Sequence, residues 1–80
     1  MEEKIAVVAI IVNDFDSVES DNALLHDYRE KIIGRLGLPV REKKISVISV
    51  VMNATSEVIN GLSGKLGMLK GVSSKVLTTK

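Results

Sequence analysis

Two short apolar runs and two segments with helical spacing alternate along the chain. Residues 5–12 (IAVVAIIV) and 45–52 (ISVISVVM) are rich in Val and Ile, so each run predicts a β-strand. Asn13-Asp14 closes the first run, and Asn53, Ala54 and Thr55 provide a stop and a helix cap after the second. Both runs are largely apolar at odd and even positions, which predicts strands with two apolar faces.

Two helices are predicted where apolar residues recur every three or four positions. The first covers residues 17–28 and begins at an Asp16-Ser17 cap, with Glu19 in capping-box spacing. The second covers residues 56–66, and Gly67 is expected to be the first residue after it. The apolar sides of the two helices consist of Val18, Leu24, Leu25 and Tyr28 in the first and Val58, Ile59, Leu62 and Leu66 in the second.

Two weaker strands complete the pattern. Residues 31–38 contain Gly34 and Gly37 and end before Pro39, features that suit an edge strand or a bulge. Residues 40–44 then form a polar hairpin turn, residues 68–71 form a second turn, and residues 72–78 form the last strand. The order of elements is therefore βαββαβ.

This order predicts an α+β protein with a ferredoxin-like, ACT-like fold: a four-stranded antiparallel sheet with both helices on one face. At 80 residues the chain forms a single domain, residues 1–80. The other sheet face then exposes apolar residues, and a core this small leaves little net stability. We therefore expect a homodimer or a higher homo-oligomer in which a second copy covers the open face.

Composition excludes several kinds of chemistry. The chain has no Cys and one His, which removes disulfides, thiol catalysis and Cys-ligated metals, so neither an enzyme nor a cofactor is expected. The net charge is +1 and aromatic residues make up 2%, so direct nucleic-acid binding is not expected. The longest apolar run is much shorter than the roughly 20 residues of a spanning helix, and the chain begins with an acidic segment. A cytoplasmic protein without a membrane segment is predicted.

One loop is the candidate ligand site. It joins the first strand to the first helix, a place where backbone N–H groups at a helix N-terminus bind small ligands. An amino-acid-like ligand is one interpretation, and a simple capping turn with Phe15 in the core is the other. The residues concerned are Asn13, Asp14, Phe15, Asp16 and Ser17.

Two further features have both structural and functional interpretations. The run of residues 61–67 (GLSGKLG) contains a Gly-Lys pair but lacks the spacing of a phosphate loop, so close packing of the helix at Gly61 and Gly64 is expected instead. His26 is the single candidate metal ligand, and Glu30 would lie beside it if the helix continued that far. An ordinary surface or interface His is the alternative, and no metal site is predicted.

Charge is distributed unevenly along the sequence. Residues 13–28 hold five acids and no Lys or Arg, whereas the hairpin carries Arg35, Arg41, Lys43 and Lys44. The asymmetry either steers subunit contacts or belongs to solvated faces.

Three strings carry a resemblance to a known family. They are Leu24-Leu25-His26, residues 35–42 (RLGLPVRE), and residues 62–67 (LSGKLG) followed by Gly71-Val72. The chain resembles the iron-only hydrogenase system regulators over about residues 5–76. These proteins are similar in fold to ACT domains and to the metal-sensing domain of nickel-responsive repressors, which form oligomers and bind small effectors between subunits.

The resemblance implies a regulatory role. It implies neither the nickel ligands of those repressors nor their DNA-binding arm, because this chain lacks the residues for both. Two functions remain open: a homo-oligomer that senses a small-molecule effector, and a ligand-free module that docks on a hydrogenase-maturation or transcription partner.

Overall fold

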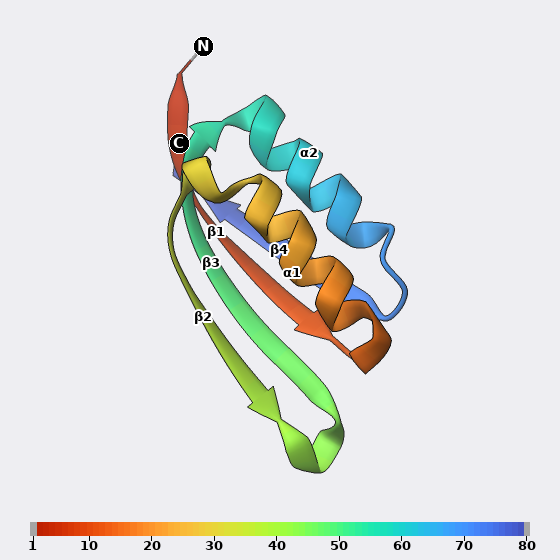
Figure 1. Cartoon of the computed structure of the whole chain (residues 1–80). Helices are drawn as coiled ribbons and strands as arrows, with labels where there is room; N and C mark the ends of the chain where they lie inside the picture. Colours follow the sequence, from red (N-terminus) through yellow and green to blue (C-terminus); the bar gives the residue numbers. More distant parts are fainter. Residues whose placement is uncertain (1, 80) are drawn as a thin grey trace.

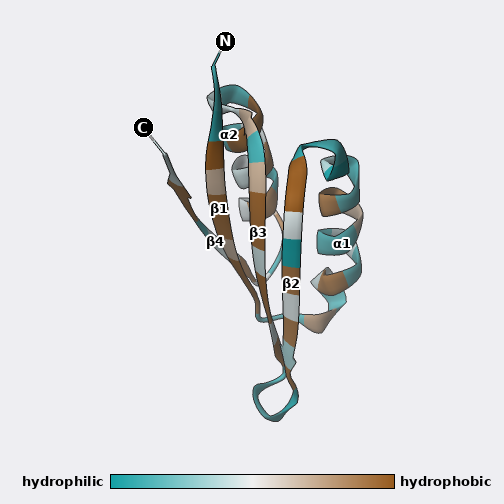
Figure 2. Ribbon diagram, turned by 90° about the vertical axis from the view of Figure 1, so that its left-hand side faces the viewer, coloured by the Kyte–Doolittle hydropathy of each residue, from teal (hydrophilic) through white to brown (hydrophobic). Residues whose placement is uncertain are grey.

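The computed structural model, which describes residues 2–79, confirms the predicted order of elements (Figure 1). The sheet contains β1 (Glu3–Val12), β2 (Ile32–Val40), β3 (Ile45–Thr55) and β4 (Val72–Thr78). The strands pair antiparallel in the order β2-β3-β1-β4, and helices α1 (Val18–Asp27) and α2 (Ser56–Gly67) lie on the same face (Figures 1 and 2). The fold is ferredoxin-like. Among the residues described, no helix is long and apolar enough to cross a membrane.

Strand pairing moves two predicted boundaries. β3 continues beyond Met52 to Thr55, because β1 begins at Glu3 and pairs with it. β2 includes Pro39 and Val40 instead of ending before the proline. Since β2 is an edge strand, Pro39 can remain in it without removing a hydrogen bond from the interior of the sheet.

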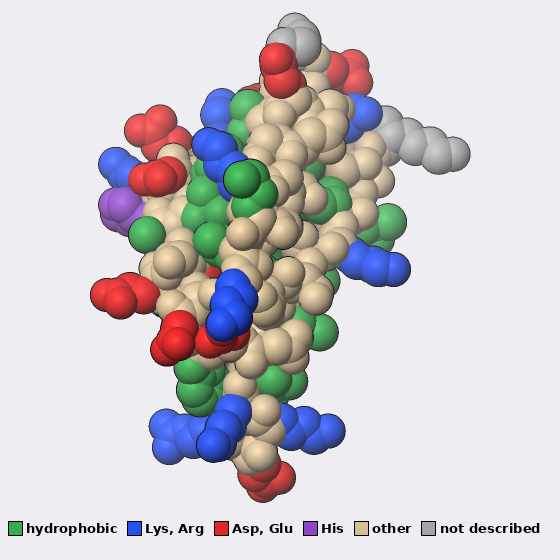
Figure 3. Space-filling model, turned by 90° about the vertical axis from the view of Figure 1, so that its right-hand side faces the viewer, with side chains coloured by type: hydrophobic (Ala, Val, Ile, Leu, Met, Phe, Trp, Pro, Cys, Tyr) green, Lys and Arg blue, Asp and Glu red, His purple; other side chains and the backbone are tan. Residues whose placement is uncertain are grey.

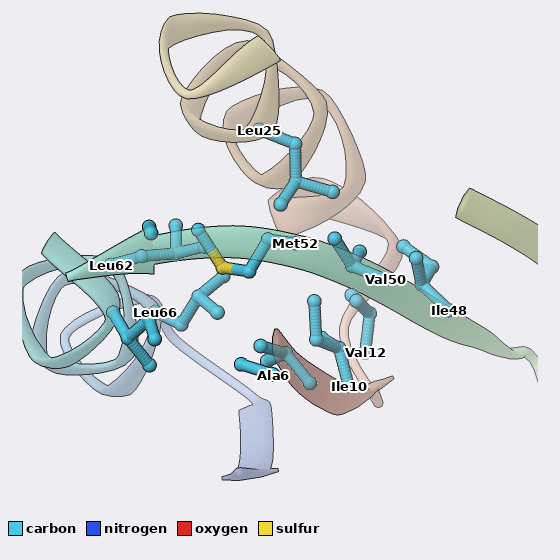
Figure 4. Packing of buried hydrophobic residues seen from close by; sticks show 12 residues of the cluster. Ala6, Ile10, Val12, Leu25, Ile48, Val50, Met52, Leu62 and Leu66 are labelled. Atoms are coloured by element: carbon cyan, nitrogen blue, oxygen red, sulfur yellow. The ribbon is translucent and has the colours of Figure 1, made fainter. Parts of the chain in front are cut away.

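The core lies between the inner sheet face and the two helices (Figure 4). Alternate residues of β1, from Ala6 to Val12, are fully buried, as period-two strands require. In Figure 4, Leu25 points from α1 toward the sheet, and Leu62 and Leu66 reach it from α2. Ile48, Val50, Met52, Ala54 and Ile59 complete the buried apolar cluster with Val8 and Ile10.

The helix ends differ in part from the predicted caps. Thr55 caps α2 as predicted, because its hydroxyl oxygen accepts a hydrogen bond from the Val58 N–H at 3.3 Å. Gly67 is the last residue of α2 and not the first residue beyond it, so that prediction is wrong. The residue with a left-handed backbone is Gly71, at φ +69°, in the turn before β4.

Gly64 does not provide the close packing expected of it. A Cβ built on Gly64 meets no atom within 4 Å, and the residue is exposed. Gly61 does face α1, where the Tyr28 hydroxyl lies 3.5 Å from its would-be Cβ, an ordinary contact distance. Only Gly61 therefore marks the helix–helix contact.

Gly64→Ala is expected to raise the free energy of unfolding by about 1 kcal/mol, because alanine favours an exposed helix interior over glycine. Urea denaturation measures the change. Gly67→Ala is the control and should gain less, since Gly67 is the terminal residue of the helix. A destabilised Gly64→Ala protein would restore the packing interpretation.

Candidate functional site

The sheet face opposite the helices is apolar and uncovered. Cross-strand partners lie on the same face, so the register assigns this surface to the odd-numbered positions of β1 and their neighbours. We call it the open face: Ile5, Val7, Ala9, Ile11, Leu36, Leu38, Val47, Ser49, Val51, Ser73, Lys75 and Leu77. Leu36 is 60% exposed and Leu77 is 74% exposed, and β1 is brown over most of its length in Figure 2. The predicted apolar face is therefore present on the surface of the chain.

A row of small and polar residues crosses the middle of the open face. Ser49 pairs with Ala9 on one side, and Lys75 pairs with Ala9 on the other. Beside this row lies a hollow of about 380 Å³ lined by Ala9, Ile11, Ser73, Ser74 and Lys75, which we call the β1–β4 hollow. The open face thus combines an apolar surface with a hollow whose lining is itself mostly apolar.

The loop predicted to bind a ligand is held to the turn before β4. The Asn13 N–H donates to the Gly71 carbonyl at 2.7 Å, and the Ser17 hydroxyl donates to the Lys70 carbonyl at 2.6 Å. The Lys70 ammonium lies 3.6 Å from a carboxylate oxygen of Asp14. Several of the loop's polar groups are therefore engaged within the chain.

Two details of this loop correct the sequence interpretation. Asp14, not Asp16 or Ser17, provides the capping carboxylate: it accepts from the Asp16 N–H at 2.9 Å and begins a 3₁₀ turn before α1. Ser17 makes no capping bond because its hydroxyl is used by Lys70. Phe15 is 49% exposed and does not enter the core. The side chains of Phe15 and Asp16 consequently face solvent.

A buried carboxylate on α1 escaped the sequence analysis. Asp21 is fully buried, and neither of its carboxylate oxygens has a hydrogen-bond partner among the residues described. Burial raises the pKa of Asp21 above its ordinary value of 3.8, and the positive charge of Arg35 partly opposes the rise. The Arg35 guanidinium donates instead to the Asn22 side-chain oxygen at 2.8 Å. The sequence did contain a signal for this burial. Asp21 lies four residues before the buried Leu25, so both side chains lie on the same side of α1.

His26 does not acquire the neighbour it would need as a ligand. α1 ends at Asp27, so Glu30 does not follow His26 by one α-helical turn. Within residues 2–79, no three His, Cys, Asp or Glu side chains form a group that could hold a metal ion.

Three of the four basic residues of the hairpin lie together at the end of the molecule formed by β2 and β3, whereas Arg35 lies within β2 beside α1. Arg41, Lys43 and Lys44 belong to its turn. Lys and Arg side chains gather at the bottom of Figure 3. Acidic side chains gather over α1 in the same view. The uneven charge of the sequence is thus uneven in space.

Comparison with known proteins gives the family. A family model described as "TM1266-like: Iron-only hydrogenase system regulator, putative" matches residues 4–76. The chain belongs to this TM1266-like family. The structure of uncharacterized protein TM1266 from Thermotoga maritima is similar to this chain at 35% identity and a TM-score of 0.94, over 99% of this chain and 100% of that one. A search of curated proteins found no match.

Membership in the TM1266-like family confirms the resemblance carried by the three sequence strings. The family's description names a regulator linked to the iron-only hydrogenase system, and it names no catalytic activity. The ferredoxin-like fold extends over nearly all of both chains.

Proposed function

We propose that this protein is a small cytoplasmic, ACT-like regulator of the iron-only hydrogenase system that works as a homo-oligomer without catalysing a reaction. A second copy covers the open face, and a small-molecule effector bound between the copies changes the assembly. The single observation that supports this proposal best is the uncovered apolar face, since a monomer of this size seldom leaves so large an apolar patch in water.

The size of the open face matches what a dimer needs. Strands lie about 4.8 Å apart and rise about 3.3 Å per residue. Four strands of 10, 9, 11 and 7 residues therefore have a flat footprint on the order of 500–600 Å². Side chains that project from the sheet make its accessible area larger than this flat footprint, closer to the ~800 Å² per partner that a stable interface buries.

A second copy fits this surface better than an unrelated partner. Its charged residues are few, Lys75 near the middle and Glu3 at the end of β1, so the surface offers little that would select a partner by charge. A two-fold axis lying between two facing sheets, parallel to their planes, would place apolar rows against apolar rows of the same pattern, which makes the surface complementary to itself.

The proposed effector site includes the loop of residues 13–17. Ile11 lines the β1–β4 hollow, and Asn13 follows it two residues later along the chain. The exposed Phe15 and Asp16 then lie next in sequence. An effector in the hollow could reach this loop, so the hollow and the loop form one candidate region.

The wild-type protein is expected to be a dimer or larger at micromolar concentration in sedimentation velocity experiments. Val7→Asp, which puts a carboxylate between Val51 and Leu77, should convert it to a monomer that keeps its far-UV circular dichroism. Asn60→Asp on the exposed side of α2 is the control and should leave the assembly unchanged. A wild-type monomer at these concentrations would contradict the proposal.

The rival function is a ligand-free module that docks on a maturation or transcription partner through the same face. Thermal-shift measurements with a broad set of metabolites separate the two, because an effector at 100 times its Kd adds about 2.7 kcal/mol of stability. A dimer without any responding metabolite would favour the rival.

A further inference from the structure

We propose that the second copy docks on the open face about a two-fold axis parallel to the strands, so that Leu36 and Leu38 of each copy enter the β1–β4 hollow of the other. This docking mode rests on the proposed dimer and specifies how its two faces meet. It connects two features at opposite edges of the sheet: the apolar hollow beside β4 and two exposed leucines on β2 (Figure 2).

Strand pairing arranges the open face in rows that run from β2 to β4. Two rows cross the hollow, and a third lies beside them. The two are Leu36, Ser49, Ala9 and Lys75, and then Leu38, Val47, Ile11 and Ser73. The third is Gly34, Val51, Val7 and Leu77. The leucines of β2 therefore lie level with the hollow, at the opposite edge of the sheet.

A two-fold axis between the facing sheets and parallel to their strands keeps every row at its own level and exchanges the two edges. β2 of one copy then lies over β4 of the other, so Leu36 and Leu38 lie over the hollow. Leu77 of one copy lies over Gly34 of the other, which has no side chain. Facing sheets pack with their strand directions within about 30° of each other, which this axis allows. The exposed leucines at each edge thus meet a hollow or a glycine.

An axis perpendicular to the strands fits the surface less well. It places β4 over β4, so the hollows of the two copies face each other and leave a space that no side chain fills. Centred on the row of Ala9, it also sets Lys75 against Lys75, and like charges repel. The axis parallel to the strands puts the two exposed Lys75 side chains at opposite edges, where each stays in water.

The hollow is large enough for the leucines. Its volume is about 380 Å³, whereas a cavity of roughly 150 Å³ holds a benzene ring, which is larger than a leucine side chain. Ala9 and Ile11 contribute to its mostly apolar lining, so filling it removes apolar area of both copies from water. An effector that enters the hollow would have to displace the leucines and would therefore loosen this contact.

Cross-linking of single-cysteine variants tests the arrangement, since the chain has no Cys of its own. Leu36→Cys and Lys75→Cys are purified separately, mixed and treated with a short bismaleimide. The mixture should give a cross-linked dimer, because Leu36 of one copy lies over Lys75 of the other. Neither variant alone should link, because the axis carries the two copies of each position to opposite edges. Asn60→Cys, on the exposed side of α2, is the control and should not link to Lys75→Cys.

Sedimentation velocity measures the contribution of the leucine contact. Leu36→Ala should weaken the dimer about a hundredfold, since a dimer contains two such contacts and each is worth about tenfold. Ile33→Ala is the matched control: Ile33 is 64% exposed and Leu36 60% exposed on the same strand, but Ile33 lies at the bulge and belongs to none of the rows. This control should leave the affinity nearly unchanged.

The outcomes separate the docking mode from the dimer itself. A dimer in which either cysteine variant links to itself, or in which no mixture links, would overturn the docking mode alone. The same holds if Leu36→Ala weakens the dimer no more than Ile33→Ala does. A wild-type protein that is a monomer at micromolar concentration would overturn the proposed dimer.

Discussion

Gly71→Ala is expected to lower the free energy of unfolding by about 2–4 kcal/mol, from backbone strain and overpacking together. Gly71 has a φ of +69°, a left-handed conformation that costs an L-residue with a side chain. The added Cβ would also lie 2.7 Å from the Cβ of Asp14 and 3.1 Å from its backbone nitrogen. The backbone and the side chain of Asp14 must both shift. The contact between the loop of residues 13–17 and the turn before β4 would therefore open.

Urea denaturation at fixed protein concentration measures this loss. Gly34→Ala is a matched control, because a Cβ at Gly34 meets nothing within 4 Å and its φ is not in the left-handed range. The control should change the free energy of unfolding by no more than about 0.5 kcal/mol. A loss below about 1 kcal/mol for Gly71→Ala would show that the loop yields without strain.

The element order was predictable because it depends on local patterns. Residues 5–12 and 45–52 are β-branched and apolar throughout, and no helix in a chain of this size could bury both of their faces. The strand ends were less predictable, since they depend on pairing. Thr55 belongs to β3 because Glu3 of β1 lies opposite it, a partner more than fifty residues away. Pro39 remains in β2 because that strand lies at the edge.

The predictions of the helix cap and of the close-packed glycine were wrong for a related reason. Ser17 has the composition of a capping residue, but Lys70 supplies a better partner for its hydroxyl from across the fold. Gly64 has the composition of a close-packing residue, but it lies on the side of α2 that meets no neighbour. In both cases the residue type was compatible with the predicted role, and the three-dimensional surroundings gave it another.

The candidate site was predictable only in outline. Apolar residues at both parities of β1 and β3 predicted an uncovered apolar face. The β1–β4 hollow was not predictable, because it requires Ser73 and Lys75 to lie beside Ile11 and Ala9, and that depends on the register of two strands. Sequence spacing within one strand contains no information about register between strands.

Asp21→Asn is expected to stabilise the protein by about 1–2 kcal/mol at neutral pH, because it removes a carboxyl group whose ionisation is disfavoured by burial and which has no hydrogen-bond partner. The amide keeps the shape of the carboxylate. It is also polar and buried, so the gain is smaller than the full penalty of the charge.

The effect should depend on pH in a defined direction. Burial raises the pKa of Asp21 in the folded protein above the value of 3.8 expected in the unfolded chain, with Arg35 opposing the rise. The folded state therefore holds the proton more tightly than the unfolded state does. Below pH 3.8 the penalty is absent; it grows as the pH rises toward the folded-state pKa and is complete above it. The difference in stability between wild type and Asp21→Asn should follow this course.

Urea denaturation of both proteins across this pH range checks the expectation. Asp27→Asn is the control, since Asp27 is exposed on the same helix and should show little change. Arg35→Met should widen the pH range over which the penalty grows, because without the guanidinium charge the pKa of Asp21 rises further. If Asp21→Asn instead lowers stability at neutral pH, Asp21 is paired with Arg35 in solution. The guanidinium would then have to leave Asn22, which accepts its hydrogen bond at 2.8 Å in this structure.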